Sequence, residues 1–164
     1  MLFPAVSFPQ IVLAIHIMAV VVGFGVTFAY PLIYAVGDRI DRRGMPWFHN
    51  LQAFLGKRLI TGGLVVVLAA GIYLAFKLHQ WHAFYVQWGL GVTIVLGALG
   101  GPYYGPKEEK LAELAQRDVE TAGGGEVSWS AEYLALRKQV QTVTLIGPAL
   151  VLITIYLMSV QAGS

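Results

Sequence analysis

The 164-residue sequence predicts an all-α protein, an integral membrane four-helix bundle that forms a single membrane domain over residues 1–164. Hydrophobic residues make up 57% of the chain and charged residues 12%, whereas about 25% of an ordinary soluble domain is charged. The charged residues gather in two stretches, 38–58 and 107–138, with Lys77 the one exception. Long apolar runs separate the two stretches, so the chain is expected to cross a membrane several times.

The placement of charge also predicts the orientation. Lys and Arg concentrate on the cytoplasmic side of membrane proteins, so both charged stretches are expected inside. Neither terminus carries a charged side chain. We therefore expect four crossings of a bacterial cytoplasmic membrane, with the N- and C-termini outside, the lipid bilayer as the main partner and no nucleic acid bound.

Four membrane helices are predicted at about 9–36, 59–78, 82–103 and 139–160. Pro31 and the pair Gly147-Pro148 are expected to bend the first and the last of them. Two further helices, at about 46–58 and 107–120, are more polar, and we expect them to lie on the cytoplasmic membrane surface. In the first of these, Trp47 and Phe54 fall on the apolar side, and His49 is interpreted as an interfacial residue.

The first membrane helix carries an unusual seam of polar and small side chains. At about 100° per residue, five residues fall within about 40° of one line: His16, Gly23, Thr27, Tyr30 and Tyr34. An unpaired polar atom in hydrocarbon costs several kcal/mol, so this seam is expected to face protein or a ligand. His16 is either a functional ligand or a buried histidine that bonds to a neighbouring helix.

The third helix repeats part of this pattern. His16, Gly23 and Thr27 coincide at one constant offset with His82, Gly89 and Thr93. This agreement predicts two pseudo-repeated helical hairpins, roughly 1–80 and 81–164, although Gly and Thr are common enough in membrane helices for a chance match.

If the repeat is real, His16 and His82 lie at similar depth and can face each other across the bundle. This arrangement resembles the way helical bundles present ligands to haem. We therefore expect a b-type haem with His16 and His82 as metal ligands, Gly23 and Gly89 giving it room, and Thr27, Thr93 and Tyr30 supplying hydrogen bonds. The function expected is electron transfer or a haem-containing membrane subunit; an enzyme of this kind would be a membrane oxidoreductase.

Other functions stay open at this stage. His16, His79, His82 and Met18 could form a copper site, because imidazole and thioether suit copper, and such a protein could be a copper or small-solute permease. Alternatively, the glycine-rich faces of the second and third helices could serve a structural or assembly subunit, in a homo-oligomer or a larger membrane complex.

The stretch from Ile15 to Gly25, with its single histidine followed by Gly23 and Gly25, resembles a loose group of small bacterial four-helix membrane proteins. The group includes integral membrane proteins of unknown function with a first-helix histidine. More distantly, the chain resembles copper-resistance-D-type proteins and the small haem-containing bacterial protoporphyrinogen oxidase. That oxidase has a lysine in its third helix, and this chain has none between Lys77 and Lys107. The resemblance thus implies the four-helix fold and haem binding, not the oxidase activity.

Overall fold

The computed structural model describes residues 6–163, and within them the chain is helical without a strand. It forms four long helices, Phe8–Ile40, Met45–Lys77, Phe84–Ala122 and Ala131–Ser159, of 33, 33, 39 and 29 residues. Each is long and apolar enough to span a membrane. The prediction of a multi-pass protein with four membrane helices is confirmed at this level.

None of the four is a regular α-helix from end to end. The first consists of α1 (Phe8–Phe24), the 3₁₀ segment η1 (Gly25–Phe28) and α2 (Tyr30–Ile40). The second consists of α3 (Met45–Leu55), the π-helical segment η2 (Gly56–Ile60) and α4 (Thr61–Lys77). The third consists of α5 (Phe84–Ala98), the π-helical segment η3 (Leu99–Tyr104) and α6 (Gly105–Ala122). In the fourth, α7 (Ala131–Thr144) and α8 (Ile146–Ser159) meet at Leu145.

Proline explains several of these irregularities. A proline has no backbone N–H to continue the helical ladder, and its ring clashes with the preceding turn. Pro31 lies in the first turn of α2, just after η1, Pro102 lies inside η3, and Pro148 follows the interruption at Leu145. The irregularities expected at Pro31 and at Gly147-Pro148 are therefore present.

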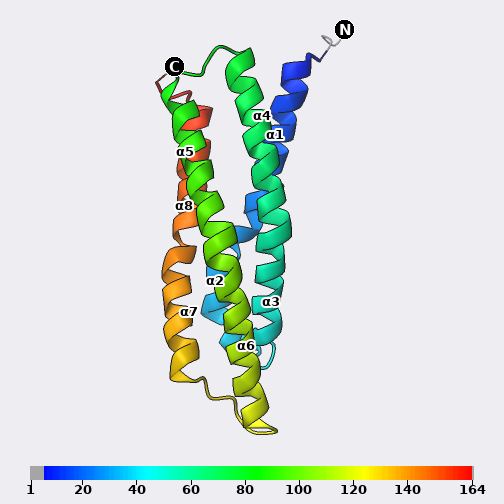
Figure 1. Ribbon diagram of the computed structural model, residues 1–164, viewed down its shortest axis with the longest axis vertical. Coiled ribbons are helices and arrows are strands. Elements are labelled where there is room, and N and C mark those ends of the chain that lie inside the picture. Colours follow the sequence, from blue (N-terminus) through cyan, green and yellow to red (C-terminus); the bar gives the residue numbers. More distant parts are fainter. Residues whose placement is uncertain (1–5, 164) are drawn as a thin grey trace.

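The helices form an elongated bundle with two different ends (Figure 1). The N-terminal end of α1, the C-terminus and the α4–α5 loop lie at one end, and the α2–α3 and α6–α7 loops lie at the other, which we call the charged end. Near the end that holds the termini, α1 packs along α4 and α5 packs along α8. Near the charged end, α3 packs along α6. Each half has its own core, one around Phe24, Ile60, Val67 and Val151, the other around Tyr34, Leu111, Tyr133 and Val140.

The two helices expected on the membrane surface differ from the prediction. Residues 46–58 and 107–120 belong to helices that continue into α4 and α5 without a break, and α3 and α6 pack against each other. A 33-residue helix is about 50 Å long at 1.5 Å per residue, so it extends well past a hydrocarbon core of about 30 Å. The first membrane helix likewise continues to Ile40, and the fourth begins at Ala131.

The buried side of α3 differs from the expectation. Trp47 and Phe54, the predicted anchoring side, are 63% and 60% exposed on the outside of the bundle, where that prediction places them. His49 and Gln52 point inward instead and are almost fully buried. In a bundle surrounded by lipid, large apolar side chains can face outward, because lipid is as apolar as a protein core.

Two glycines set the closest approach between α1 and α4. A methyl group on Gly63 would lie 2.7 Å from the Cα atom of Gly23, and one on Gly23 would lie 3.0 Å from the Cα atom of Gly63. These neighbours are backbone atoms, so neither side can make room without moving a helix. Small residues at such crossings allow the dispersion contacts that hold membrane helices together.

We expect Gly63→Ala to lower the free energy of unfolding by about 1–3 kcal/mol, because the added methyl overpacks the α1–α4 contact. Gly62→Ala is the matched control, since Gly62 is exposed and has no atom within 4 Å of an added methyl. That variant should be neutral or slightly stabilising, as alanine favours a helix more than glycine does. Denaturant unfolding in detergent micelles measures both, and equal effects of the two changes would contradict the assignment.

Candidate functional site

The carboxylate of Glu108 on α6 is buried at the centre of a polar network. The residue is 4% exposed, and donors from two other helical elements surround it. Tyr34 of α2 donates its hydroxyl to Oε1, and Nδ1 of His49 on α3 lies 2.7 Å from Oε2. The amide nitrogen of Gln52, in the orientation that the network requires, lies 3.0 Å from Oε1 and 3.1 Å from Oε2. A buried carboxylate is stable only with such partners, so these contacts belong together.

His49 extends this network to a fourth helix. Its second ring nitrogen, Nε2, lies 3.1 Å from the hydroxyl of Tyr133 on α7, and the side chain is only 1% exposed. In the neutral tautomer with the proton on Nδ1, His49 donates to Glu108 and accepts from Tyr133. The imidazole thus bridges two oxygen atoms on opposite sides of its ring, which is the geometry of a proton shuttle.

Arg137 fixes the two tyrosines of this network. One guanidinium nitrogen donates to the backbone carbonyl of Tyr34 over 2.6 Å, and another forms an ion pair with Asp38. The guanidinium carbon lies 5.9 Å from the ring centroids of both Tyr34 and Tyr133. Because Asp38 balances its charge, Arg137 ties α7 to α2 without neutralising Glu108.

A small cavity of about 60 Å³ adjoins Glu108 in the middle of the bundle. Every irregular segment contributes to its lining: Thr27 from η1, Gly56 and Ile60 from η2, Leu99, Gly100 and Tyr104 from η3, and Thr144, Gly147 and Pro148 at the α7–α8 junction. Non-α backbone within membrane helices occurs where it is buried in protein or lines a cavity, and π-helical segments are frequent at functional sites. The coincidence of all four at one level marks this cavity as a candidate site.

Two hydroxyls at this cavity lack a partner. The phenol oxygens of Tyr30 and Tyr104 are buried and form no hydrogen bond with any residue that the structure describes, although both residues line the cavity. An unsatisfied buried hydroxyl is costly, and both oxygens are enclosed by protein atoms rather than open to the cavity. The cavity has room for a few water molecules, and the surface that lines it is mostly apolar.

The predicted ligand His16 lies elsewhere, between α1 and α4. It is 9% exposed, its Nδ1 lies 3.0 Å from the carbonyl oxygen of Val67, and its ring contacts Gly71. His82 is exposed in the loop after α4. From Gly71 to Lys77, α4 rises about 9 Å at 1.5 Å per residue, so the two histidines lie at different heights. The structure does not bring them together.

Four of the other five residues predicted to bind a cofactor have structural contacts of their own, and Tyr30 is the exception. The space over Gly23 is occupied by Gly63, and that over Gly89 by Met158. Thr27 donates to the carbonyl of Phe24, and Thr93 to that of Gly89. Of the predicted set, Thr27 and Tyr30 line the cavity near Glu108.

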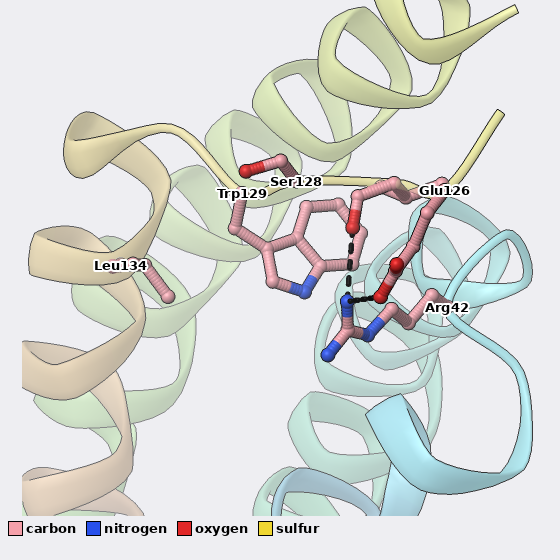
Figure 2. A pocket seen from close by; sticks show the side chains of 6 residues that line it. Arg42, Glu126, Ser128, Trp129 and Leu134 are labelled. Carbon is pink, nitrogen blue, oxygen red and sulfur yellow. Dashed lines mark hydrogen bonds and ion pairs between the residues drawn. The ribbon is translucent and has the colours of Figure 1, made fainter.

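A second, wider hollow of about 450 Å³ lies at the charged end, beside the α6–α7 loop (Figure 2). Arg42 reaches across it to the carboxylate of Glu126 at 3.2 Å and the carbonyl of Val127 at 3.0 Å, with Trp129 and Leu134 on its other side. These contacts join the α2–α3 turn to the α6–α7 loop. They satisfy Arg42 with partners from the chain itself, so this hollow is weaker as a ligand site than the central cavity.

The comparisons with known proteins add no identification. No protein-family model, no curated protein and no solved structure matches the chain. Within residues 6–163, no group of three or more His, Cys, Asp or Glu side chains is arranged to hold a metal ion. The site is therefore assigned from its own geometry.

Glu108 should matter for stability far more than its neighbour Glu109. Glu108→Ala leaves the buried donors of Tyr34, His49 and Gln52 without their acceptor, and we expect a loss of about 3–5 kcal/mol in the free energy of unfolding. Glu109→Ala removes an exposed ion pair with Lys57, with side chains 48% and 53% exposed, and should cost at most about 1 kcal/mol. Unfolding in detergent micelles compares the two, and similar losses would show that the Glu108 network is not a structural centre.

Proposed function

We propose that this protein is a proton-coupled small-solute permease in which Glu108 binds and releases the proton. The charged end faces the cytoplasm in this proposal, because Lys and Arg concentrate on that side, and both termini lie outside. The main support is the position of Glu108, between a histidine that can transfer protons and a small cavity at the irregular segments of all four helices. Ionisable residues within membrane bundles usually serve ion or proton pathways.

His49 can deliver the proton to Glu108 by exchanging tautomers. A proton that arrives at Nε2, on the Tyr133 side, allows the Nδ1 proton to pass to Oε2 of Glu108, 2.7 Å away. His49 ends neutral as the other tautomer, and the carboxylate becomes a carboxylic acid. The ring returns to its first tautomer when it loses the proton at Nε2 and takes up a proton at Nδ1, which reverses the transfer.

The opposite side of the cavity is closed by apolar residues. Phe24, Ile60, Val67 and Val151 pack together there, and Val20, Leu64 and Leu96 lie against them. Alternating access requires such a barrier on one side of the binding site at a time. On this side α1 packs closely on α4, and α5 packs closely on α8. Each pair belongs to one of the two predicted hairpins, and in this proposal each hairpin moves as a unit. The repeat suggested by the sequence stays a prediction.

Proton movement through reconstituted protein tests this function. Vesicles that contain a pH-sensitive dye and the purified protein should acidify faster than empty vesicles when potassium efflux sets a potential that is negative inside. Glu108→Gln should abolish the difference, because an amide cannot take up the proton, whereas Glu109→Gln should retain it. Equal rates for the native protein and Glu108→Gln would contradict the proposal.

Haem binding, expected from the sequence, is a second candidate function. The observation that favours it is the contact between Nδ1 of His16 and the carbonyl of Val67. When Nδ1–H donates there, the lone pair of Nε2 is available to iron, and such carbonyl contacts commonly orient metal-ligating histidines. The sequence-based hypothesis names His82 as the second axial ligand, but His82 lies in the exposed loop after α4 and not beside His16, which weighs against a bis-histidine site.

An absorption spectrum tests the haem hypothesis. Protein purified from haem-replete cells should show a low-spin spectrum with a Soret band, and His16→Ala and His82→Ala should each remove it. A colourless, folded preparation would contradict it. Metal analysis of the same sample tests the copper alternative, and the oligomeric state of a variant without both histidines tests the assembly alternative.

A further inference from the structure

We propose that the central cavity binds one small apolar molecule, of the size of dioxygen or xenon, and that this molecule keeps water out of the space beside Glu108. The binding site goes beyond the proposed function and follows from the geometry of the cavity alone. The exclusion of water rests on the proposed function, because it concerns the route of the proton that Glu108 binds.

The surface that lines this cavity is mostly apolar. Apolar side chains and glycine backbone supply it: Phe24, Gly56, Ile60, Leu96, Leu99, Gly100 and Pro148. A buried water molecule needs about two to four polar partners, and cavities lined by Leu, Ile and Phe therefore stay dry and accept apolar guests. An apolar molecule, in contrast, gains dispersion contacts with the walls of such a cavity and gives up no hydrogen bonds.

The polar side chains of the lining direct their polar atoms elsewhere. Thr27 and Thr144 each donate the hydroxyl hydrogen to a carbonyl of their own long helix, at 2.6 and 2.8 Å. Both carboxylate oxygens of Glu108 are bonded within the network of buried side chains around it. The hydroxyls of Tyr30 and Tyr104 are enclosed by protein atoms. Water that enters the cavity therefore exchanges its hydrogen bonds in bulk solvent for very few new ones.

Gly56 shows where the lining is open. The residue is buried and lines the cavity, yet a methyl group added to it meets no described atom within 4 Å apart from its own neighbours along the helix. Side chains in a close-packed protein interior leave few such openings. The missing side chain of Gly56 is therefore directed into the cavity, and a larger residue at this position would fill it.

The volume of the cavity limits the guest. A cavity of about 150 Å³ accepts either benzene or xenon, whereas this one measures about 60 Å³. It therefore has room for a xenon atom or a diatomic gas but not for an aromatic ring. None of the described residues that line it is exposed, so protein separates the guest from the acyl chains of the bilayer. Dioxygen is a natural molecule of this size, and it dissolves better in hydrocarbon than in water.

The same space lies on the route of the proton in the proposed function. The Glu108 network borders it on one side, and the apolar cluster around Phe24 and Val151 borders it on the other. Protons move along chains of hydrogen-bonded groups, so a proton leaves Glu108 towards the outside only when water enters the cavity. Hydrophobic constrictions in channels close in this way, by losing their water. A bound apolar molecule keeps the cavity closed to the proton.

Nuclear magnetic resonance of the purified full-length protein in detergent micelles under xenon pressure tests the site. With isotope-labelled isoleucine and leucine methyl groups, the signal of Ile60 should shift and then saturate as the pressure rises. Ile153 is 46% exposed on the outside of the bundle. Its signal should change in proportion to the pressure, because it meets only xenon that is dissolved in the micelle.

Gly56→Val should remove the saturating shift of Ile60, because the added side chain occupies the cavity. Gly62→Val is the matched control, since Gly62 belongs to the same long helix but is exposed and lies outside the lining. This variant should bind xenon as the native protein does. A saturating Ile60 shift of equal size in Gly56→Val, or none in the native protein, would overturn the site.

Benzene tests the size limit, and it keeps the inference falsifiable if Gly56→Val does not fold. Benzene should change the Leu99 signal of the native protein only in proportion to its concentration in the micelle. Ile60→Ala shortens a side chain of the lining and enlarges the cavity, so Leu99 should then show a saturating response to benzene. The same saturating response in both proteins would contradict a cavity of xenon size.

Proton movement under xenon separates this inference from the proposed function. At a xenon concentration equal to its dissociation constant, half of the cavities are occupied, and the Glu108-dependent acidification of vesicles should slow about twofold. The background rate with Glu108→Gln should not change. Saturable xenon binding without this slowing would refute the exclusion of water and leave the site standing. Saturable binding with no Glu108-dependent acidification at all would refute the proposed function and, with it, the exclusion of water.

Discussion

The burial of one carboxylate, that of Glu108, determines how the charged half of the bundle is built. A carboxylate removed from water needs hydrogen-bond donors, and here they come from Tyr34 on α2 and from His49 and Gln52 on α3. Tyr133 and Arg137 add α7 to the same assembly. Each of the four long helices therefore contributes to one polar network, and replacing any of these residues changes the surroundings of all the others.

The same network accounts for the position of the cavity. Tyr34 and Glu108 lie just on the charged side of the level where η1, η2, η3 and the α7–α8 junction depart from α-helical geometry. Irregular backbone leaves space and polar groups that regular helices would fill or satisfy. The apolar cluster around Phe24 and Val67 closes the other side. The cavity therefore lies between a polar hydrogen-bonded network on one side and an apolar cluster on the other.

The sequence was sufficient to predict the four helices and the irregularities at Pro31 and Pro148, because hydropathy and proline act locally. It was misleading about α3, where amphipathicity suggested a surface helix. The buried face, Met45, His49, Gln52, Ala53 and Gly56, follows the 3.6-residue period, but it joins small and polar residues rather than large apolar ones. In a bundle surrounded by lipid, small and polar residues at helical spacing therefore indicate the buried face better than large apolar residues do. Glu108 could not be separated from eight other acidic residues by spacing alone, because only the packing of α3 on α6 selects it.

Infrared difference spectroscopy of the native protein through a pH step tests the central claim most directly. Uptake of a proton by Glu108 predicts the appearance of the C=O stretching band of a buried carboxylic acid, shifted in heavy water and absent from Glu108→Gln. A band that is unchanged in Glu108→Gln, or no carboxylic acid band at any pH at which the protein stays folded, would contradict the assignment of Glu108 as the proton-binding residue.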